Sequence, residues 1–210
     1  MRSRFDEELE ELNEQMLRMG MLVEAGIEKA VSMLDKRDEE KAKEVIRYEE
    51  EIDNMEYEIQ VHCLRLLIEQ QPVARDLRKI SAALKIITDM ERIGDQSRDI
   101  AEICMYVDLD KDMQSVQHVK EMAESTIDMV NGTIKAFVDG DIELARQIQE
   151  DDDIVDDYFV KVRDDLIKLI REEDIEPSYI IDVLMIAKYL ERIADHAVNI
   201  SEWVIFTVEG

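Results

Sequence analysis

The sequence predicts an all-α protein made of two tandem copies of an antiparallel three-helix bundle, with six long helices in all. Its 210 residues include only six Gly and two Pro, and 37% are charged. This composition is typical of long helices and leaves little material for the turns of a sandwich or barrel. Apolar residues recur in alternating steps of four and three, the pattern of helices packed in a bundle. The third observation is an internal repeat, which predicts two domains, residues 1–107 and 108–210.

The repeat is clearest in one motif that occurs twice. Met90-Glu91-Arg92-Ile93-Gly94-Asp95 returns 100 residues later as Leu190-Glu191-Arg192-Ile193-Ala194-Asp195. Upstream of the motif the offset is 103, which matches Ala42 with Ala145 and Val45 with Ile148. Internal repetition on this scale indicates the architecture, because each copy is expected to fold as the same unit. The sequence therefore predicts a tandem duplication.

The first half contains three predicted helices. Apolar residues over 5–33 step four and three without a break, as in the seam of a packed helix. Asp38 is the expected N-cap of a second helix, which runs to about Gln70. Gln71-Pro72 then interrupts the helix, because proline lacks the backbone N–H. A third helix, over about 74–106, carries the first copy of the motif.

The second half repeats the three helices after a linker. The periodicity breaks over residues 107–112, which we expect to connect the halves. Helices then follow over about 113–137, 141–171 and 178–208, and Asp141 is the expected N-cap of the second of these. Short connectors between long helices predict antiparallel neighbours within each half.

Each copy of the motif places two carboxylates four residues apart. The pairs are Glu91 with Asp95 and Glu191 with Asp195, and on a helix each pair shares one face. Like charges at this spacing repel by a few tenths of a kcal/mol. A matched pair in both copies therefore indicates that a cation belongs beside each of them.

The second helix of each half carries a further pair. Glu49 and Asp53 are four residues apart, and Asp152 and Asp156 match them at the offset of 103. If the second and third helices are neighbours, four carboxylates converge in each half, as in metal sites of helical bundles. Oxygen ligands favour hard cations such as Mg²⁺, Mn²⁺, Ca²⁺ or iron, with Zn²⁺ as a further candidate. The sequence predicts two such sites.

Two features of the motif leave a plainer interpretation open. Arg92 and Arg192 could neutralise a local carboxylate as ion pairs, and charge runs on helices are usually solvated faces. The acidic neighbours that we assign to solvent are Glu50, Glu51, Asp151 and Asp153.

Histidine is not part of the repeated pattern. His196 follows Asp195, but the first copy has Gln96 at the matching position. His196 is therefore either an extra ligand of the second site or a surface residue. His62 and His118 lie near no acidic or cysteine cluster at ligand spacing, and we interpret both as structural.

Composition excludes several classes of function. A formal net charge of −26 would repel the phosphates of nucleic acids. No segment has the ~18–20 consecutive apolar residues of a membrane span, and the N-terminus has no signal-peptide region. Cys63 and Cys104 lie in apolar stretches without CxxC spacing, as expected of buried thiols in a reducing compartment. We expect a cytoplasmic protein, and the sequence has no phosphate-binding loop, Gly-x-Ser-x-Gly or other catalytic motif.

Taken together, these motifs resemble the PhoU family, the accessory regulators of bacterial phosphate-specific transport. The doubled Glu-Arg-Ile-(Gly/Ala)-Asp motif carries the resemblance. So do the connector Gln71-Pro72-Val73-Ala74-Arg75-Asp76-Leu77-Arg78 and the segment Tyr189-Leu190-Glu191-Arg192-Ile193-Ala194-Asp195-His196-Ala197-Val198-Asn199-Ile200. The resemblance covers essentially the whole chain. It implies a PhoU-like fold of two three-helix bundles.

The resemblance also implies a function that is not enzymatic. Members of the family restrain phosphate uptake and phosphate-starvation signalling, and their partners are the ATP-binding subunit of the phosphate ABC transporter and a sensor histidine kinase. It implies a location at the inner membrane through these proteins rather than by insertion, with a homodimer as a candidate assembly. The acidic motifs of the family bind metal ions, which extends to Glu91, Asp95, Glu191 and Asp195, and further to Glu49, Asp53, Asp152 and Asp156.

Two other classes of function remain open on the residues alone. One is a carboxylate-bridged metalloenzyme, which needs open coordination positions and a substrate pocket between helices. The other is a purely structural helical adaptor whose acidic stripe only keeps it soluble. The metal content of the purified protein separates the adaptor, which needs no metal, from the metalloenzyme and from the metal-binding regulator.

Overall fold

The part of the chain that the structure describes forms six long helices and one short 3-10 helix. The computed structural model describes residues 2–70, 72–107, 109, 114–171 and 175–209. The helices are α1 (Arg2–Val31), α2 (Glu39–Gln70), α3 (Ala74–Cys104), α4 (Gln114–Asp139), α5 (Ile142–Leu169) and α6 (Pro177–Glu209), with the 3-10 helix η1 over Ser32–Leu34. The described residues contain no strand. The predicted all-α duplication is confirmed.

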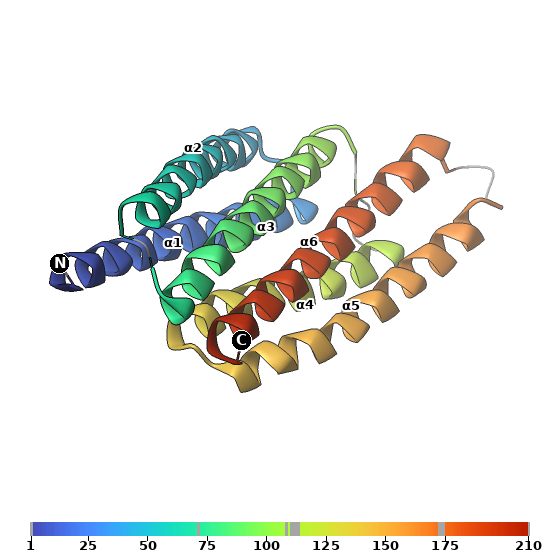
Figure 1. Ribbon diagram of the computed structural model, residues 1–210. Helices are drawn as coiled ribbons and strands as arrows, with labels where there is room; N and C mark the ends of the chain where they lie inside the picture. Colours follow the sequence, from blue (N-terminus) through green and yellow to red (C-terminus); the bar gives the residue numbers. More distant parts are fainter. Residues whose placement is uncertain (1, 71, 108, 110–113, 172–174, 210) are drawn as a thin grey trace.

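The helices form two layers (Figure 1). Helices α2, α3, α6 and α5 lie side by side in that order, and each contacts the next. Helix α1 lies behind α2 and α3, α4 lies behind α5 and α6, and these two rear helices contact each other. The two halves therefore meet through the pair of helices that carry the repeated motif.

Helices α3 and α6 run antiparallel at the centre of the molecule (Figure 1). Asp89 of α3 accepts a hydrogen bond from Asn199 of α6, whereas Asp99 of α3 accepts one from Tyr189. Early residues of one helix thus face late residues of the other. This arrangement relates the halves by an approximate two-fold axis near the centre of the two motifs.

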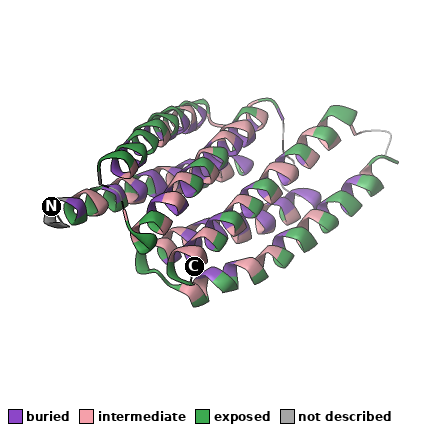
Figure 2. Ribbon diagram, in the orientation of Figure 1, coloured by how far each residue is buried: buried purple, intermediate pink, exposed green. Residues whose placement is uncertain are grey.

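The core runs between the two layers, where the buried faces of the helices meet (Figure 2). Helices α3 and α6 contribute buried residues at the predicted seam, including Ile93 and Ile193, both with no exposed surface. The outer faces of α2 and α5 are exposed (Figure 2). Because apolar residues at four-three spacing cover one face of a helix, the seams in the sequence identify the buried side of each element.

Local signals determine where the helices begin. Asp38 Oδ1 accepts from the backbone N–H groups of Glu40 and Lys41 at 3.0 and 3.2 Å, and Asp141 Oδ1 accepts from Leu144 N–H at 3.1 Å. Both predicted N-caps are confirmed, since each carboxylate satisfies N–H groups that a first turn leaves unpaired. Gly140, at φ +62°, makes the tight turn before Asp141.

Some expected bounds differ from the structure. Helix α3 ends at Cys104 rather than near Tyr106, and α1 ends at Val31 with Met33 in η1. Residues 108 and 110–113 lie outside the described residues, so the predicted linker and the boundary at residue 108 stay predictions.

Candidate metal centres

The first acidic cluster lies between α2 and α3. One carboxylate oxygen from each of Glu49, Asp53 and Asp95 lies within 4.8 Å of the other two. The helices come close here: a Cβ placed on Gly94 would lie only 3.1 Å from Ile52 Cδ1. Because Asp53 and Asp95 directly follow these two residues, the close approach brings their carboxylates to the same groove. Three oxygens at this spacing suit a hard cation.

Glu91 belongs to the same cluster. Burial raises the pKa of its carboxyl, and the negative charges of Asp95 and Asp53 raise it further, against Arg92. The pKa of Asp53 is raised by burial and then by Asp95. All four predicted residues of the first half therefore lie close enough to repel one another, which a bound cation would offset.

Two arginines partly neutralise the first cluster. Arg92 Nη1 lies 2.9 Å from Asp95 Oδ2, and Arg92 Nε lies 3.3 Å from Glu91 Oε2. Arg98 Nη1 donates to Glu49 Oε1 and its Nε donates to Glu102 Oε1, both at 2.9 Å. The ion pairs of Arg92 were anticipated from the sequence, whereas the contact of Arg98 with α2 was not. The only sequence pattern that involves Arg98 is its four-residue spacing to Glu102.

The second acidic cluster lies between α5 and α6. The pKa of Asp152 is raised to about 6, first by burial, then by the charges of Asp156 and Asp195, and less by those of Asp153 and Glu191. The pKa values of Asp156 and Asp195 are raised by burial first and then by Glu191. The four predicted residues of the second half thus also lie close together. Lys188 forms an ion pair with Glu191.

The two clusters are equivalent in position but not in charge. Arg98 corresponds to Val198 at the offset of 100, so Asp152 lacks the arginine that pairs with its counterpart Glu49. Among the described residues only the first cluster brings three carboxylate oxygens within 4.8 Å of one another. The first cluster is therefore more compact, and the second has less compensation from basic side chains. Geometry favours the first as a preformed site, and electrostatics favours the second as the one that most needs a cation.

His196 contacts the other half of the molecule. Its Nδ1 lies 2.8 Å from Asp89 Oδ1 on α3, and Asn199 Nδ2 donates to the same oxygen at 3.2 Å. His196 therefore joins the halves, and neither alternative for it, an extra ligand or a plain surface residue, describes this contact. Sequence reasoning could not find Asp89, which is 107 positions away.

The other two histidines are held within their own halves. His62 Nδ1 lies 2.8 Å from Gln15 Oε1, and His118 Nδ1 lies 2.8 Å from Asp165 Oδ2. At the offset of 103, His62 matches Asp165 and Gln15 matches His118, so the same contact recurs with its partners exchanged. Both histidines are structural, as expected.

The remaining expectations concern solvated acids and thiols. Glu50, Glu51 and Asp153 are exposed, whereas Asp151 is half-buried and accepts from Gln147 Nε2 at 2.9 Å. The two cysteines are buried, and burial raises the pKa of each thiol to about 12. Such thiols stay protonated and unreactive at neutral pH. The two buried cysteines are Cys63 and Cys104.

The raised pKa of Asp152 predicts a pH-dependent stability of the metal-free protein. A carboxyl whose pKa rises on folding from 3.8 to about 6 favours the folded state only while it is protonated. Its contribution is therefore lost as pH rises from about 4 to about 7. We expect the Asp152→Asn variant, in chelator at pH 8, to melt higher than the unsubstituted protein. We expect the free energy of unfolding to increase by about 1 kcal/mol, which is less than the full pKa shift implies because the carboxyl is partly exposed. This increase corresponds to a rise in melting temperature of about 2–4 °C.

At pH 4.5 the difference between the two proteins should be much smaller, since Asp152 is then neutral in the folded state and only the unfolded chain has begun to ionise. Glu150→Gln is the matched control, because it removes one charge from an exposed position of the same helix. Melting curves at both pH values test the prediction. Equal melting temperatures of Asp152→Asn and the unsubstituted protein at pH 8 would contradict it.

These observations define a class of protein: a duplicated all-α fold with one acidic cluster in each half, between its second and third helices. None of the described helices is both long and apolar enough to traverse a bilayer. A family model described as the PhoU domain matches residues 16–104 and again 119–204. The chain belongs to the PhoU family.

Relatives and solved structures agree with this assignment. The chain is 33% identical over 207 residues to the phosphate-specific transport system accessory protein PhoU homolog of Clostridium acetobutylicum, covering 98% of this chain and 94% of the relative. The homolog of the same name from Aquifex aeolicus is 35% identical over 203 residues, or 97% and 92% of the two chains. The crystal structure of PhoU from Pseudomonas aeruginosa superposes with a TM-score of 0.93 at 32% identity, covering 98% and 99%. The phosphate transport system regulatory protein PhoU from Streptococcus pneumoniae gives 0.88 at 27% identity, covering 97% and 96%.

Proposed function

We propose that this protein is a non-enzymatic accessory regulator that restrains phosphate uptake and phosphate-starvation signalling. One observation carries the proposal: relatives named accessory proteins of the phosphate-specific transport system match the chain over nearly its whole length. The absence of a recognisable catalytic motif in the sequence agrees with a role through binding. The acidic clusters supply the site at which that binding is adjusted.

The two clusters are proposed to hold divalent or iron-type cations. The first would be held by Glu49, Asp53, Glu91 and Asp95, and its support is the three oxygens within 4.8 Å of one another. The second would be held by the matching residues of α5 and α6. A cation in either cluster joins two neighbouring helices, α2 with α3 or α5 with α6, and removes the repulsion between their carboxylates. The four residues that would hold the second cation are Asp152, Asp156, Glu191 and Asp195.

The proposed partners are the ATP-binding subunit of the phosphate ABC transporter and the sensor histidine kinase of the phosphate response. A net charge of −26 suits docking onto basic protein surfaces, where electrostatic attraction speeds encounter and selects partners. The same charge repels anionic lipid. We therefore place the protein in the cytoplasm, at the inner face of the membrane through protein contacts.

A pull-down from phosphate-replete cells tests the partners. With tagged full-length protein in low salt, we expect the transporter's ATP-binding subunit and the kinase to co-purify. Their recovery should fall as salt rises, because exposed charges are screened over about 8–10 Å near physiological ionic strength. The control is the same extract from cells that express the tag alone.

Two outcomes would contradict the proposal. One is recovery of neither subunit at low salt. The other is an unchanged starvation response in phosphate-rich medium when the gene is deleted, since loss of a restraining protein should switch that response on. Turnover of a substrate that depends on the bound metal would favour the metalloenzyme instead.

A further inference from the structure

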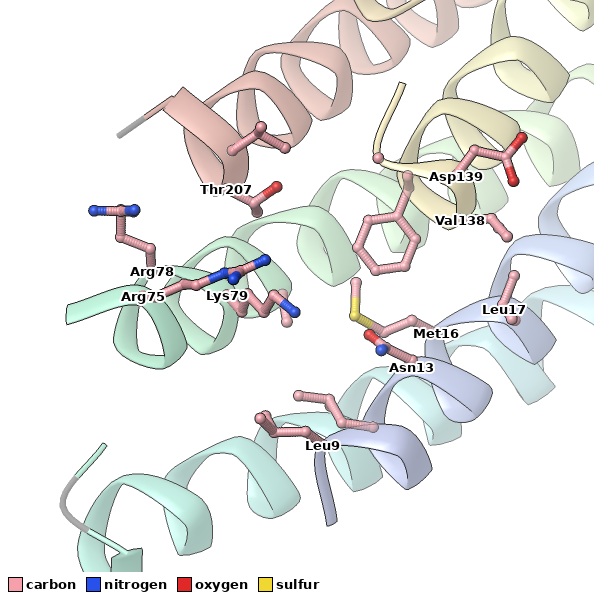
Figure 3. A pocket seen from close by; sticks show the side chains of 15 residues that line it. Leu9, Asn13, Met16, Leu17, Arg75, Arg78, Lys79, Val138, Asp139 and Thr207 are labelled. Carbon is pink, nitrogen blue, oxygen red and sulfur yellow. The ribbon is translucent and has the colours of Figure 1, made fainter. Parts of the chain in front are cut away.

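A further candidate site, separate from the two acidic clusters, lies at the N-terminal end of α3 in a cavity of about 560 Å³. It is lined by α1, the first turns of α3, the turn between α4 and α5, and the last turn of α6 (Figure 3). The cavity thus lies between the two halves. Arg78 and Asp95 are separated by 17 residues, or about 25 Å along the helix, so the cavity is distinct from the first acidic cluster.

Three basic side chains line one side of the cavity. Arg75, Arg78 and Lys79 all come from the start of α3 (Figure 3). Positive charge is unfavourable at a helix N-terminus, where the backbone N–H groups already carry partial positive charge. Asp76 is the only acidic residue in that first turn. Of the residues that line the cavity only Asp139 is acidic, so the three basic side chains leave a local positive charge that an anion would offset.

One of these side chains has an unsatisfied buried donor. Arg78 Nε is buried without a hydrogen-bond partner. A buried N–H that loses its bond to water and gains none in return is destabilising by about 1–3 kcal/mol. Guanidinium groups bind phosphate and carboxylate through paired N–H donors. Arg78 therefore carries a donor that the protein itself leaves unused, on a side chain that lines the cavity.

The rest of the lining is largely apolar. Leu9 and Met16 of α1 lie on one wall (Figure 3), together with Leu12 of the same helix, and Phe137 of the last turn of α4 also lines the cavity. A cavity of this volume with apolar walls and a few charged groups at one side has the character of a small-molecule site. Inorganic phosphate alone would leave these walls without a partner.

The duplication by itself does not account for the basic grouping. The equivalent end of the other half also has a cavity, and the residues that line it include Met33, Leu34, Lys36, Arg37 and Cys104. The start of α6 contributes no residue to that lining, and at the offset of 100 Arg78 and Lys79 match the uncharged Ser178 and Tyr179. The basic start of the helix is thus particular to α3.

The geometry points to a binding site for a small organic anion, with its phosphate or carboxylate on Arg75, Arg78 and Lys79 and its apolar or aromatic body against Leu9, Met16 and Phe137. Such a ligand contacts both halves at once, so its binding would stabilise their present arrangement. This site goes beyond the proposed role of the acidic clusters and does not depend on metal.

The probe for the test is 1-naphthyl phosphate, which joins a phosphate to a rigid apolar body. Calorimetric titration of the full-length protein, in low salt with chelator, should give binding at least tenfold tighter than for inorganic phosphate or for neutral 1-naphthol. The Arg75→Glu/Lys79→Glu variant should lose at least tenfold in affinity. Both positions are exposed, and glutamate at position 75 is favourable in the first turn of α3, so this variant should fold.

The matched control is Lys36→Glu/Arg37→Glu, which reverses two exposed charges at the equivalent cavity. It should bind the probe as the unsubstituted protein does. Phe137→Leu should weaken binding of 1-naphthyl phosphate but leave that of inorganic phosphate unchanged.

Three results would overturn the inference. The first is equal affinity for 1-naphthyl phosphate and inorganic phosphate, and the second is equal loss of affinity in both charge-reversal variants. The third is tighter binding of an acidic peptide than of the probe at the same residues, which would make the site a peptide-docking surface. If Arg75→Glu/Lys79→Glu unfolds, Arg75→Gln/Lys79→Gln provides the same comparison.

Discussion

Manganese is expected to raise the melting temperature of the metal-free protein by about 5–10 °C. A ligand at 100 times its Kd stabilises the folded state by about 2.7 kcal/mol, and 1 kcal/mol corresponds to about 2–4 °C for a chain of this size. The physical basis is the repulsion within the two acidic clusters, where burial and neighbouring carboxylates raise the pKa of Asp53, Glu91 and Asp152. Mg²⁺, Fe²⁺ and Zn²⁺ in the same titration rank the metals.

Variants of the two clusters should separate their contributions. Asp53→Asn/Asp95→Asn should abolish the part of the shift that comes from the first cluster, and Asp156→Asn/Asp195→Asn the part from the second. In chelator both variants should melt higher than the unsubstituted protein, because each removes repulsion. The opposite signs with and without metal distinguish a metal site from damage to the fold.

Glu50→Gln/Glu51→Gln is the control for charge alone, since both residues are exposed on α2 beside the first cluster. It should respond to manganese as the unsubstituted protein does. A manganese response that is equal in the control and in both cluster variants would show that cations act only on the overall charge. An absent response to all four metals would remove the proposed sites.

The second large effect concerns regulation in the cell and rests on the proposed function. In a strain that lacks the gene, the variant Asp53→Asn/Asp95→Asn/Asp156→Asn/Asp195→Asn should fail to restore repression in phosphate-rich medium. A reporter of the starvation response should stay near the level of the deletion strain. The reason is that metal-free clusters no longer hold α2 against α3 and α5 against α6 in the arrangement that partners bind.

The control carries four substitutions of the same charge on exposed acids: Glu50→Gln/Glu51→Gln/Asp153→Asn/Asp157→Asn. It should restore repression fully, and immunoblots should give equal amounts of both proteins. Restoration by both variants would mean that the clusters have no regulatory role. Failure of both would assign the effect to net surface charge.

The acidic residues of each cluster could be predicted from the sequence, but their contacts with basic side chains could not. The repeated four-residue spacing of Glu91 with Asp95, and of Glu49 with Asp53, placed each pair on one helical face. That the two faces meet depends on the close approach of Gly94 to Ile52. Arg98 reaches Glu49 from 49 positions away, and no local pattern contains such a contact. Consequently the different charge balance of the two clusters emerged only from the packed helices.

Periodicity and the internal repeat were sufficient to determine the six helices, their N-caps at Asp38 and Asp141, and the duplicated architecture. These features depend on neighbours within one or two helical turns, which the chain specifies directly. The tertiary structure alone decided that α3 and α6 pack antiparallel at the centre, that His196 contacts Asp89, and that basic residues of α3 line a cavity shared by both halves. Such contacts join segments far apart in the chain, and they form only where the buried apolar faces of the helices fix the distance and direction between them.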